Sequence, residues 1–145
     1  MKLMLADRVN VARCAAEFCY VGTERNGKIH TVFVPGHEGK KYFVILKRDE
    51  KGLILECQHI LPHSNAFLCP GGCKTVCYHQ MAAVMFVAQQ AGYRTAITET
   101  LGDAIRFTHL HDGATISRLM SKHAKDKVLF VVFYKWGDFY GKRCS

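Results

Sequence analysis

The sequence lacks any apolar run long enough to cross a membrane. Its longest apolar runs, residues 81–88 and 128–134, fall far short of the roughly 20 residues that a spanning helix requires. The first residues also lack the pattern of a secretory signal, because a single lysine and a very short apolar stretch precede Asp7 and Arg8. We therefore expect no membrane partner and a reducing compartment, either the cytoplasm or, in a eukaryote, the nucleus.

The chain also lacks the low apolar content of disordered proteins, and no internal repeat, linker or low-complexity tract divides it. Apolar residues make up 49% of the 145 residues and charged residues 22%, which is typical of a globular domain. A chain of this length is sufficient for one ordinary core. We expect a single domain over residues 1–145, with a metal-binding unit at 40–92 and a C-terminal extension at 93–145.

An acidic surplus is missing as well, since 20 lysines and arginines outnumber 12 aspartates and glutamates and give a net charge of +8. Residues 1–56 contain ten basic and seven acidic side chains, residues 57–117 contain three of each, and residues 118–145 contain seven and two. The basic excess therefore lies at the two ends. A basic chain favours anionic partners such as nucleic acid, although a basic and soluble surface explains the charge equally well.

Apolar spacing predicts a helix followed by a meander of strands. Leu5, Val9, Ala12, Ala16 and Cys19 recur every three or four residues, which predicts an amphipathic helix over about residues 3–18 with Cys14 and Cys19 as packing residues. Turn signals at Asn26-Gly27, 35–39 and 49–52 then separate three segments rich in β-branched and aromatic residues, 29–34, 42–46 and 53–55. These segments predict an antiparallel meander.

The second half of the chain predicts further helices and one strand. Residues 58–77 look irregular, and so long a loop is uncommon in a compact domain unless something ties it down. Residues 78–91 predict a buried helix that ends at Gly92. Residues 100–110 and 114–125 predict two weaker helices, and residues 128–134 predict a buried strand.

Four of the seven cysteines lie between residues 57 and 77, close to histidines, a pattern that indicates metal or redox chemistry in a reducing compartment. Cys57-x-His59 and Cys77-x-His79 are separated by seventeen residues. Two close pairs of ligands, one ending a strand and one beginning a helix, are how small tetrahedral zinc sites are assembled. With all four positions filled by protein, the ion would be one structural Zn²⁺.

Two other cysteines leave the ligand set open. Cys69 and Cys73 lie in the irregular segment, and either of them is an alternative to a ligand of the predicted quartet. With His63 they also have the composition of a second, incomplete site. The simpler explanation for both cysteines is that they are buried free thiols, which are common in proteins.

Residues 40–91 resemble the SWIM-type zinc finger, whose pattern is Cys-x-Cys, a variable spacer and Cys-x-His on a β-β-α unit. His59 stands where that family usually has its second cysteine, and histidine is also a zinc ligand. The resemblance covers about a third of the chain. It implies an α+β fold, in which a small antiparallel sheet carries a zinc-bound β-β-α unit and flanking helices. It also implies a role in binding DNA or proteins, as in transposases, chromatin-linked factors and ubiquitin ligases.

The leading hypothesis is a zinc-stabilised accessory or regulatory protein that binds nucleic acid, DNA in preference to RNA. Basic residues beside the predicted hairpin and basic and aromatic residues near the C-terminus would supply the contacts, since cations bind phosphates and rings stack on bases. They are Lys40, Lys41, Lys47, Arg48, Lys135, Trp136, Lys142 and Arg143. The alternative, favoured by the electrically neutral centre of the chain, is a zinc-scaffolded adapter for protein–protein interaction.

A third hypothesis is a metal-dependent hydrolase built on His109, His111 and Asp112. Two histidines and a carboxylate occur together in some hydrolase sites, but beside a turn at Gly113 they are more often surface residues. The sequence contains no phosphate-binding glycine-rich loop, no serine elbow and no paired acidic motif. Binding is therefore favoured over catalysis.

Overall fold

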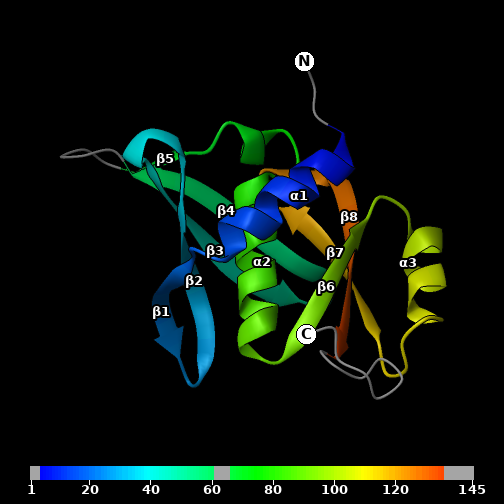
Figure 1. Ribbon diagram of the computed structural model, residues 1–145. Helices are drawn as coiled ribbons and strands as arrows, with labels where there is room; N and C mark the ends of the chain where they lie inside the picture. The colour runs from blue at the N-terminus through cyan, green and yellow to red at the C-terminus, as the bar shows by residue number, and fades with distance from the viewer. Residues whose placement is uncertain (1–3, 61–65, 136–145) are drawn as a thin grey trace.

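The computed structural model describes residues 4–60 and 66–135 (Figure 1). The helices are α1 (Leu5–Ala16), α2 (Tyr78–Gln90) and α3 (Leu101–Thr108), with short 3₁₀ turns at His37–Gly39 and Gly71–Cys73. The strands are β1 (Tyr20–Arg25), β2 (Lys28–Pro35), β3 (Lys41–Asp49), β4 (Gly52–Ile60), β5 (Ala66–Leu68), β6 (Tyr93–Thr98), β7 (Thr115–Ser121) and β8 (Ala124–Lys135). The fold class is α+β, as the sequence predicts.

All the strands described join one sheet. Its order is β1-β2-β3-β4-β7-β8-β6, and β5 pairs with the end of β4. Every pairing is antiparallel except β4 with β7, which is parallel. The prediction of a small antiparallel sheet was therefore wrong in size and in one pairing. The segment after α2 is the reason, because it adds three strands to the meander through the contact of β7 with β4.

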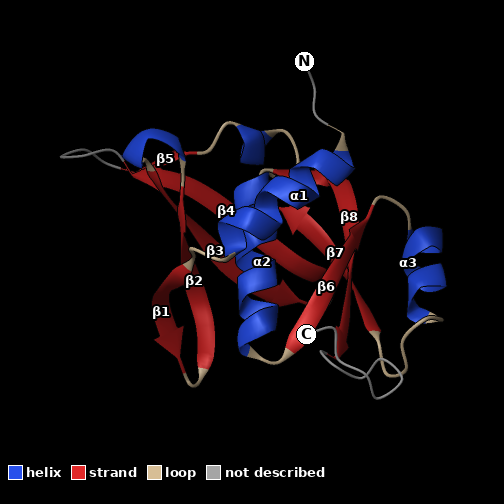
Figure 2. Ribbon diagram, viewed as in Figure 1, coloured by secondary structure: helices blue, strands red, loops and turns tan. Residues whose placement is uncertain are grey.

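Helices α1 and α2 lie together on one face of the sheet, in front of it in Figure 2, and α3 lies at its far end. The strands β2, β3 and β4 bury Val32, Val44 and Leu55 beneath α2, and each of these side chains is fully buried. The ring of Phe107 in α3 lies 5.3 Å from the ring of Tyr134 in β8. The residue before Tyr134, Phe133, lines a pocket together with residues of α2 and therefore faces that helix. Because successive side chains in a strand alternate between faces, α3 packs on the face opposite α1 and α2.

The helices predicted over about residues 3–18 and over residues 78–91 are present as α1 and α2. Ala12 and Ala16 are buried against α2, and Cys19 is buried just beyond the helix, but Cys14 is exposed, so its prediction as a packing residue was wrong. Helix α2 is buried along most of its length, as its apolar composition predicts. No helix among the described residues is long and apolar enough to span a membrane.

The turn predicted at Asn26-Gly27 is present between the first two strands. Asn26 and Gly27 both have positive φ, 52° and 75°, and connect β1 to β2. This conformation is easily adopted by asparagine and glycine and matches the twist of the two flanking strands.

Three local predictions were wrong or incomplete. Residues 114–125 form no helix but strand β7 and the turn into β8, because β7 finds partners on both sides, β4 and β8. Residues 58–77 are less irregular than expected, since β4 continues to Ile60 and β5 pairs with it. Strands β1 and β6 were not predicted at all.

Candidate metal centre

Three cysteines and one histidine meet where the sheet contacts the start of α2. They are Cys57, Cys69, Cys77 and His79, whose ligand atoms all lie within 4.8 Å of one another. The four residues are buried, with exposed fractions of 3%, 5%, 6% and 6%. Thiolate and imidazole are the donors that soft and borderline transition-metal ions prefer, so this cluster could hold a metal ion.

Strand β4 and the segment after β5 bring the first two cysteines together. Residues Leu53, Leu55 and Cys57 alternate onto the face of β4 that α2 covers, so the Cys57 thiol points toward the helix. The backbone N–H of Cys69 donates to the carbonyl of Cys57 at 2.9 Å. This hydrogen bond fixes Cys69 beside the strand, although the two cysteines are twelve residues apart in the sequence.

The first turn of α2 supplies the other two ligand atoms. Cys77 is the N-cap residue, and its backbone N–H donates to the side-chain Oε1 of Gln80 at 2.9 Å. This bond satisfies a donor that a helix start otherwise leaves without a partner. Because His79 lies two residues later, in the first turn, the rigid end of the helix determines the positions of both ligands.

A buried polar network holds the surrounding elements in register. The Gln80 amide, fully buried, donates through Nε2 to the carbonyl of Leu55 at 3.1 Å and to the hydroxyl of Ser121 at 2.9 Å. The Ser121 hydroxyl in turn donates to the carbonyl of Gly72. Strands β4 and β7, the Gly71–Cys73 turn and α2 are thereby connected around the four ligands. Buried polar networks of this kind rigidify a structure when every member has a partner.

Two glycines allow the loop to approach the cluster closely. A Cβ atom at Gly71 would lie 3.2 Å from the Cβ of Cys77, and one at Gly72 would lie 3.3 Å from the Nε2 of Gln80. Both distances are tighter than ordinary contacts, so a larger residue would push the loop, and Cys69 with it, away from the helix. The Pro70-Gly71-Gly72 sequence after Cys69 was the signal that could have identified Cys69 as a ligand.

The His79 ring is oriented toward the thiols by its aromatic neighbours. It stacks on Tyr42 of β3, with ring centroids 3.7 Å apart, and lies 3.9 Å from the ring of Tyr78. Its Nδ1 lies 3.7 Å from the Sγ of Cys69. Its Nε2 is buried and has no hydrogen-bond partner in the described part of the chain. Nδ1 is therefore the nitrogen directed toward the thiols.

The three thiols perturb one another's pKa values. The Cys57 and Cys77 thiols donate hydrogen bonds to the Cys69 thiolate, which holds the pKa of Cys69 far below its usual range. Hydrogen bonds of Cys57 with Cys69 and with Cys77, followed by burial, raise the pKa of Cys57. For Cys77 the bond with Cys57 lowers the pKa, but its bond with Cys69 and its burial outweigh this and raise the pKa to about 12. Because a metal ion binds thiolates, metal binding at this cluster would release thiol protons.

The separation between Cys69 and His79 matches that of two ligands in a tetrahedral site. Metal–sulfur bonds of about 2.3 Å and metal–nitrogen bonds of about 2.0–2.1 Å place ligand atoms roughly 3.5–3.8 Å apart. The separation of 3.7 Å between Cys69 Sγ and His79 Nδ1 lies within this range. An ion held by all four side chains would have no coordination position open for water or substrate, as in structural zinc sites.

His59, a member of the predicted quartet, is not in the cluster. Strand β4 continues through His59, so this residue lies two positions along an extended chain from Cys57, about 6.6 Å away. Its ring packs between Tyr42 and Phe67, with centroids 5.7 Å and 5.8 Å away, and its Nδ1 is buried without a hydrogen-bond partner among the described residues. Cys69, which the sequence indicates as an alternative ligand, is the fourth member of the cluster in place of His59.

The remaining alternative ligands lie elsewhere. Cys73 is exposed on the 3₁₀ turn, and His63 lies outside the described residues. His109, His111 and Asp112 belong to no group of metal-ligating side chains within the described ranges. His111 stacks on Tyr134 with ring centroids 4.2 Å apart.

The basic residues predicted to bind nucleic acid divide between surfaces. Lys40, Lys41, Lys47 and Arg48 are exposed on and beside β3, but alternation in the strand sends Lys41 and Lys47 to one face of the sheet and Arg48 to the other. The Lys135 ammonium lies 5.2 Å from the ring of Tyr93. Trp136, Lys142 and Arg143 lie outside the described residues.

No family model, curated protein or solved structure matches this chain. Its function is therefore inferred from the geometry described above.

Proposed function

We propose that this protein is a zinc-stabilised nucleic-acid-binding accessory or regulatory protein, with one structural Zn²⁺ on Cys57, Cys69, Cys77 and His79. The set of three thiols and one imidazole supports zinc, which such sets bind in many small structural sites. The order of elements supports a relation to the SWIM-type finger, since the β3–β4 hairpin is followed by α2 with Cys77 and His79 at its start. Cys69 replaces the second residue of the first pair.

The observation that carries the nucleic-acid proposal is an aromatic row on the face of the sheet that faces away from α1 and α2. Tyr20, Phe33 and Phe43 come from the neighbouring strands β1, β2 and β3. The rings of Tyr20 and Phe33 are stacked with centroids 5.2 Å apart, and those of Phe33 and Phe43 lie 6.2 Å apart. Among the described helices, α1 and α2 cover the opposite face and α3 packs against β6, β7 and β8.

Lysines flank this row on β3. Since Val44 of β3 faces the core, Phe43 points outward, and Lys41 and Lys47 point to the same side. Tyr20 is 48% exposed, so its ring is accessible at the edge of the sheet. Phe33 and Phe43 are half-buried. An exposed ring beside cations suits a single strand, because a base stacks on the ring while the ammonium groups bind phosphates. This arrangement favours single-stranded DNA or RNA over a duplex, whose bases are already stacked.

The proposal is tested by fluorescence anisotropy with a single-stranded DNA, a single-stranded RNA and a duplex of about 20 nucleotides, at several salt concentrations from about 50 to 200 mM. The double variant Lys41→Gln/Lys47→Gln should weaken binding and reduce the salt slope by about 1.4, or about 0.7 for each phosphate contact. Tyr20→Thr should weaken binding about tenfold through lost stacking.

Two matched controls locate the surface. Lys125→Gln/Lys127→Gln removes the same charge from exposed residues of β8, and Phe67→Thr removes an exposed ring from β5, away from the aromatic row. Both controls should bind as the unaltered protein does. Failure to bind any of the three nucleic acids at the lowest salt concentration would contradict the proposal, and so would equal losses in the test and control variants.

An adapter role is the second candidate, favoured by an apolar surface at α3. Leu101 and Ile105 lie one helical turn apart and are 49% and 43% exposed, and Leu110, just after the helix, is 65% exposed. Protein partners commonly cover such patches. Co-purification of a protein that nuclease treatment leaves bound, and that Leu101→Gln/Ile105→Gln releases, would favour the adapter over the nucleic-acid-binding protein.

A further inference from the structure

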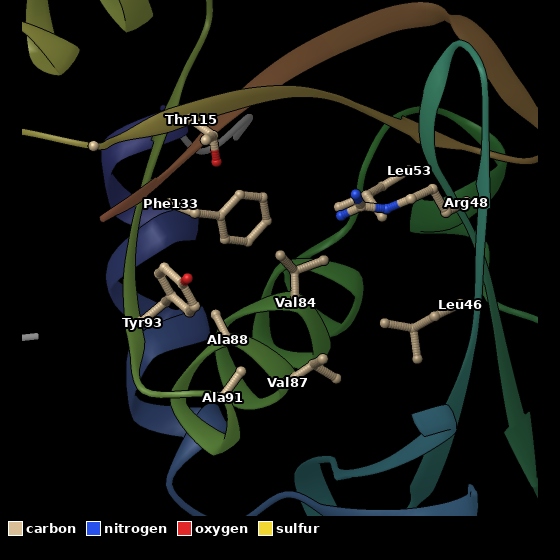
Figure 3. A pocket seen from close by; sticks show the side chains of 11 residues that line it. Leu46, Arg48, Leu53, Val84, Val87, Ala88, Ala91, Tyr93, Thr115 and Phe133 are labelled. Carbon is tan, nitrogen blue, oxygen red and sulfur yellow. The ribbon is translucent and has the colours of Figure 1, made fainter. Parts of the chain in front are cut away.

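A pocket lies between α2 and the sheet, away from the metal ligands. Its volume is about 320 Å³, and its walls come from the C-terminal half of α2 and from β3, β4, β6, β7 and β8 (Figure 3). Ala88, near the middle of its helical wall, lies nine residues after His79, or about 13 Å along the helix axis. The pocket is therefore separate from the cluster at the start of the helix.

The size of the pocket exceeds that of an ordinary packing defect. Protein interiors are close-packed and contain few voids larger than a water molecule, whereas sites for small molecules have volumes of about 300–1,000 Å³. Small side chains make the space, because Ala88 faces Leu46, Leu53 and Phe133 across it. These walls are apolar, so an apolar molecule would gain the free energy of burial there.

One charged group enters this apolar site. Arg48 of β3 is directed from the strand toward the middle of the pocket, beside Leu53 (Figure 3). The lining contains no acidic side chain, and no ion pair of Arg48 occurs within residues 4–60 and 66–135. A guanidinium group beside apolar walls suits a carboxylate, to which it donates two parallel hydrogen bonds.

We propose that this pocket binds a small apolar carboxylic acid, with the carboxylate on Arg48 and the hydrocarbon part between α2 and the sheet. At about 30 Å³ for each non-hydrogen atom, the pocket holds roughly ten such atoms. Octanoate has this size and serves as the probe. The proposal depends on neither the bound metal nor the nucleic-acid surface.

The test is an NMR titration of the 145-residue chain with octanoate, in which the amide signals of Val84, Val87 and Ala88 report on the pocket. Octanoate should bind with a dissociation constant of about 1 mM or tighter and shift these signals. Arg48→Gln should weaken binding about tenfold to a hundredfold, the range for a lost charge-assisted hydrogen bond. Octylamine, of similar length and opposite charge, should not bind.

Lys47→Gln is the matched control, because Lys47 is the neighbouring cation in β3 and points to the opposite face. Its affinity for octanoate should equal that of the unaltered protein. Ala88→Leu places additional carbon atoms in the pocket and should abolish binding. Equal losses in Arg48→Gln and Lys47→Gln would overturn the proposal, as would equal affinities for octanoate and octylamine or an absence of shifts in α2.

Discussion

Replacing Cys69 with serine is expected to release the metal ion or weaken its binding greatly, whereas replacing His59 with phenylalanine is expected to leave it bound. Cys69 lies within the cluster, and His59 lies two residues along β4 from Cys57. The two variants distinguish the ligand set of the structure from the one that the residue spacing predicts. Phenylalanine preserves the ring between Tyr42 and Phe67 and removes a buried nitrogen that has no partner among the described residues.

The expected loss of stability follows from the loops that the ion closes. An ion bound at Cys57, Cys69 and Cys77 would close loops over residues 57–69 and 69–77. The chain-entropy relation for cross-links gives stabilisations of about 3 and about 2.5 kcal/mol for these two loops. With Cys69 removed and the ion held by three ligands, the single loop 57–77 contributes about 3.3 kcal/mol. The free energy of unfolding should therefore fall by about 2 kcal/mol if the ion stays and by about 5 kcal/mol if it leaves.

Two measurements check this prediction: the metal content of each variant by mass spectrometry, and urea unfolding followed by circular dichroism with added Zn²⁺ or with a chelator. A loss of about 5 kcal/mol is large compared with the 5–15 kcal/mol that stabilises a typical domain, so Cys69→Ser should resemble the chelated protein. His59→Phe should keep one ion and a free energy of unfolding within about 1 kcal/mol of the unaltered value. If Cys69→Ser retains the ion at full stability while His59→Phe releases it, the ligand set proposed from the structure is wrong.

Two further predictions concern groups around the site. Gln80→Ala removes the partner of the Cys77 N–H and one of the two hydrogen bonds at both the Leu55 carbonyl and the Ser121 hydroxyl. The free energy of unfolding in urea should therefore fall by about 2–4 kcal/mol; a loss below about 0.5 kcal/mol would show that the network is unimportant. Burial alone would raise the pKa of Glu56, but the hydrogen bond from His123 and the charge of Lys122 outweigh it and lower this pKa. The stability contributed by the Glu56 carboxylate is therefore present above its unfolded pKa of about 4.3 and is lost as the pH falls through the lower folded value. The free energies of unfolding in urea of the unaltered protein and Glu56→Gln should thus differ by about 1 kcal/mol or less at pH 7 and converge in acid; a constant difference would contradict the assignment.

Local chemistry made several elements predictable from the sequence. The continuous apolar run before Gly92 predicts a buried helix, and α2 is that helix, because such a run is stable only when it is covered on most sides. Asn26-Gly27 predicts the first hairpin, since few other residue pairs tolerate two positive φ angles. Cys77-x-His79 before the helix places two ligands on its first turn, where the helix itself determines their separation.

Contacts between distant segments were not predictable in the same way. Residues 115–121 form a strand because β4 and β8 lie on either side of them, and neither partner is visible in a local window. The choice of Cys69 over His59 depends on where β4 ends. That boundary is set by the pairing of β5 with residues 58–60, and this pairing also carries Cys69 back to the strand.

The sequence by itself determined that cysteine and histidine donors gather in the middle of a basic, globular chain, because composition and spacing belong to the residues alone. The tertiary structure decided which four donors meet, which face of the sheet presents Tyr20, Phe33 and Phe43, and that Arg48 points into an apolar pocket. The physical reason is that strand alternation and long-range pairing determine where a side chain points, and both depend on partners far away in the sequence.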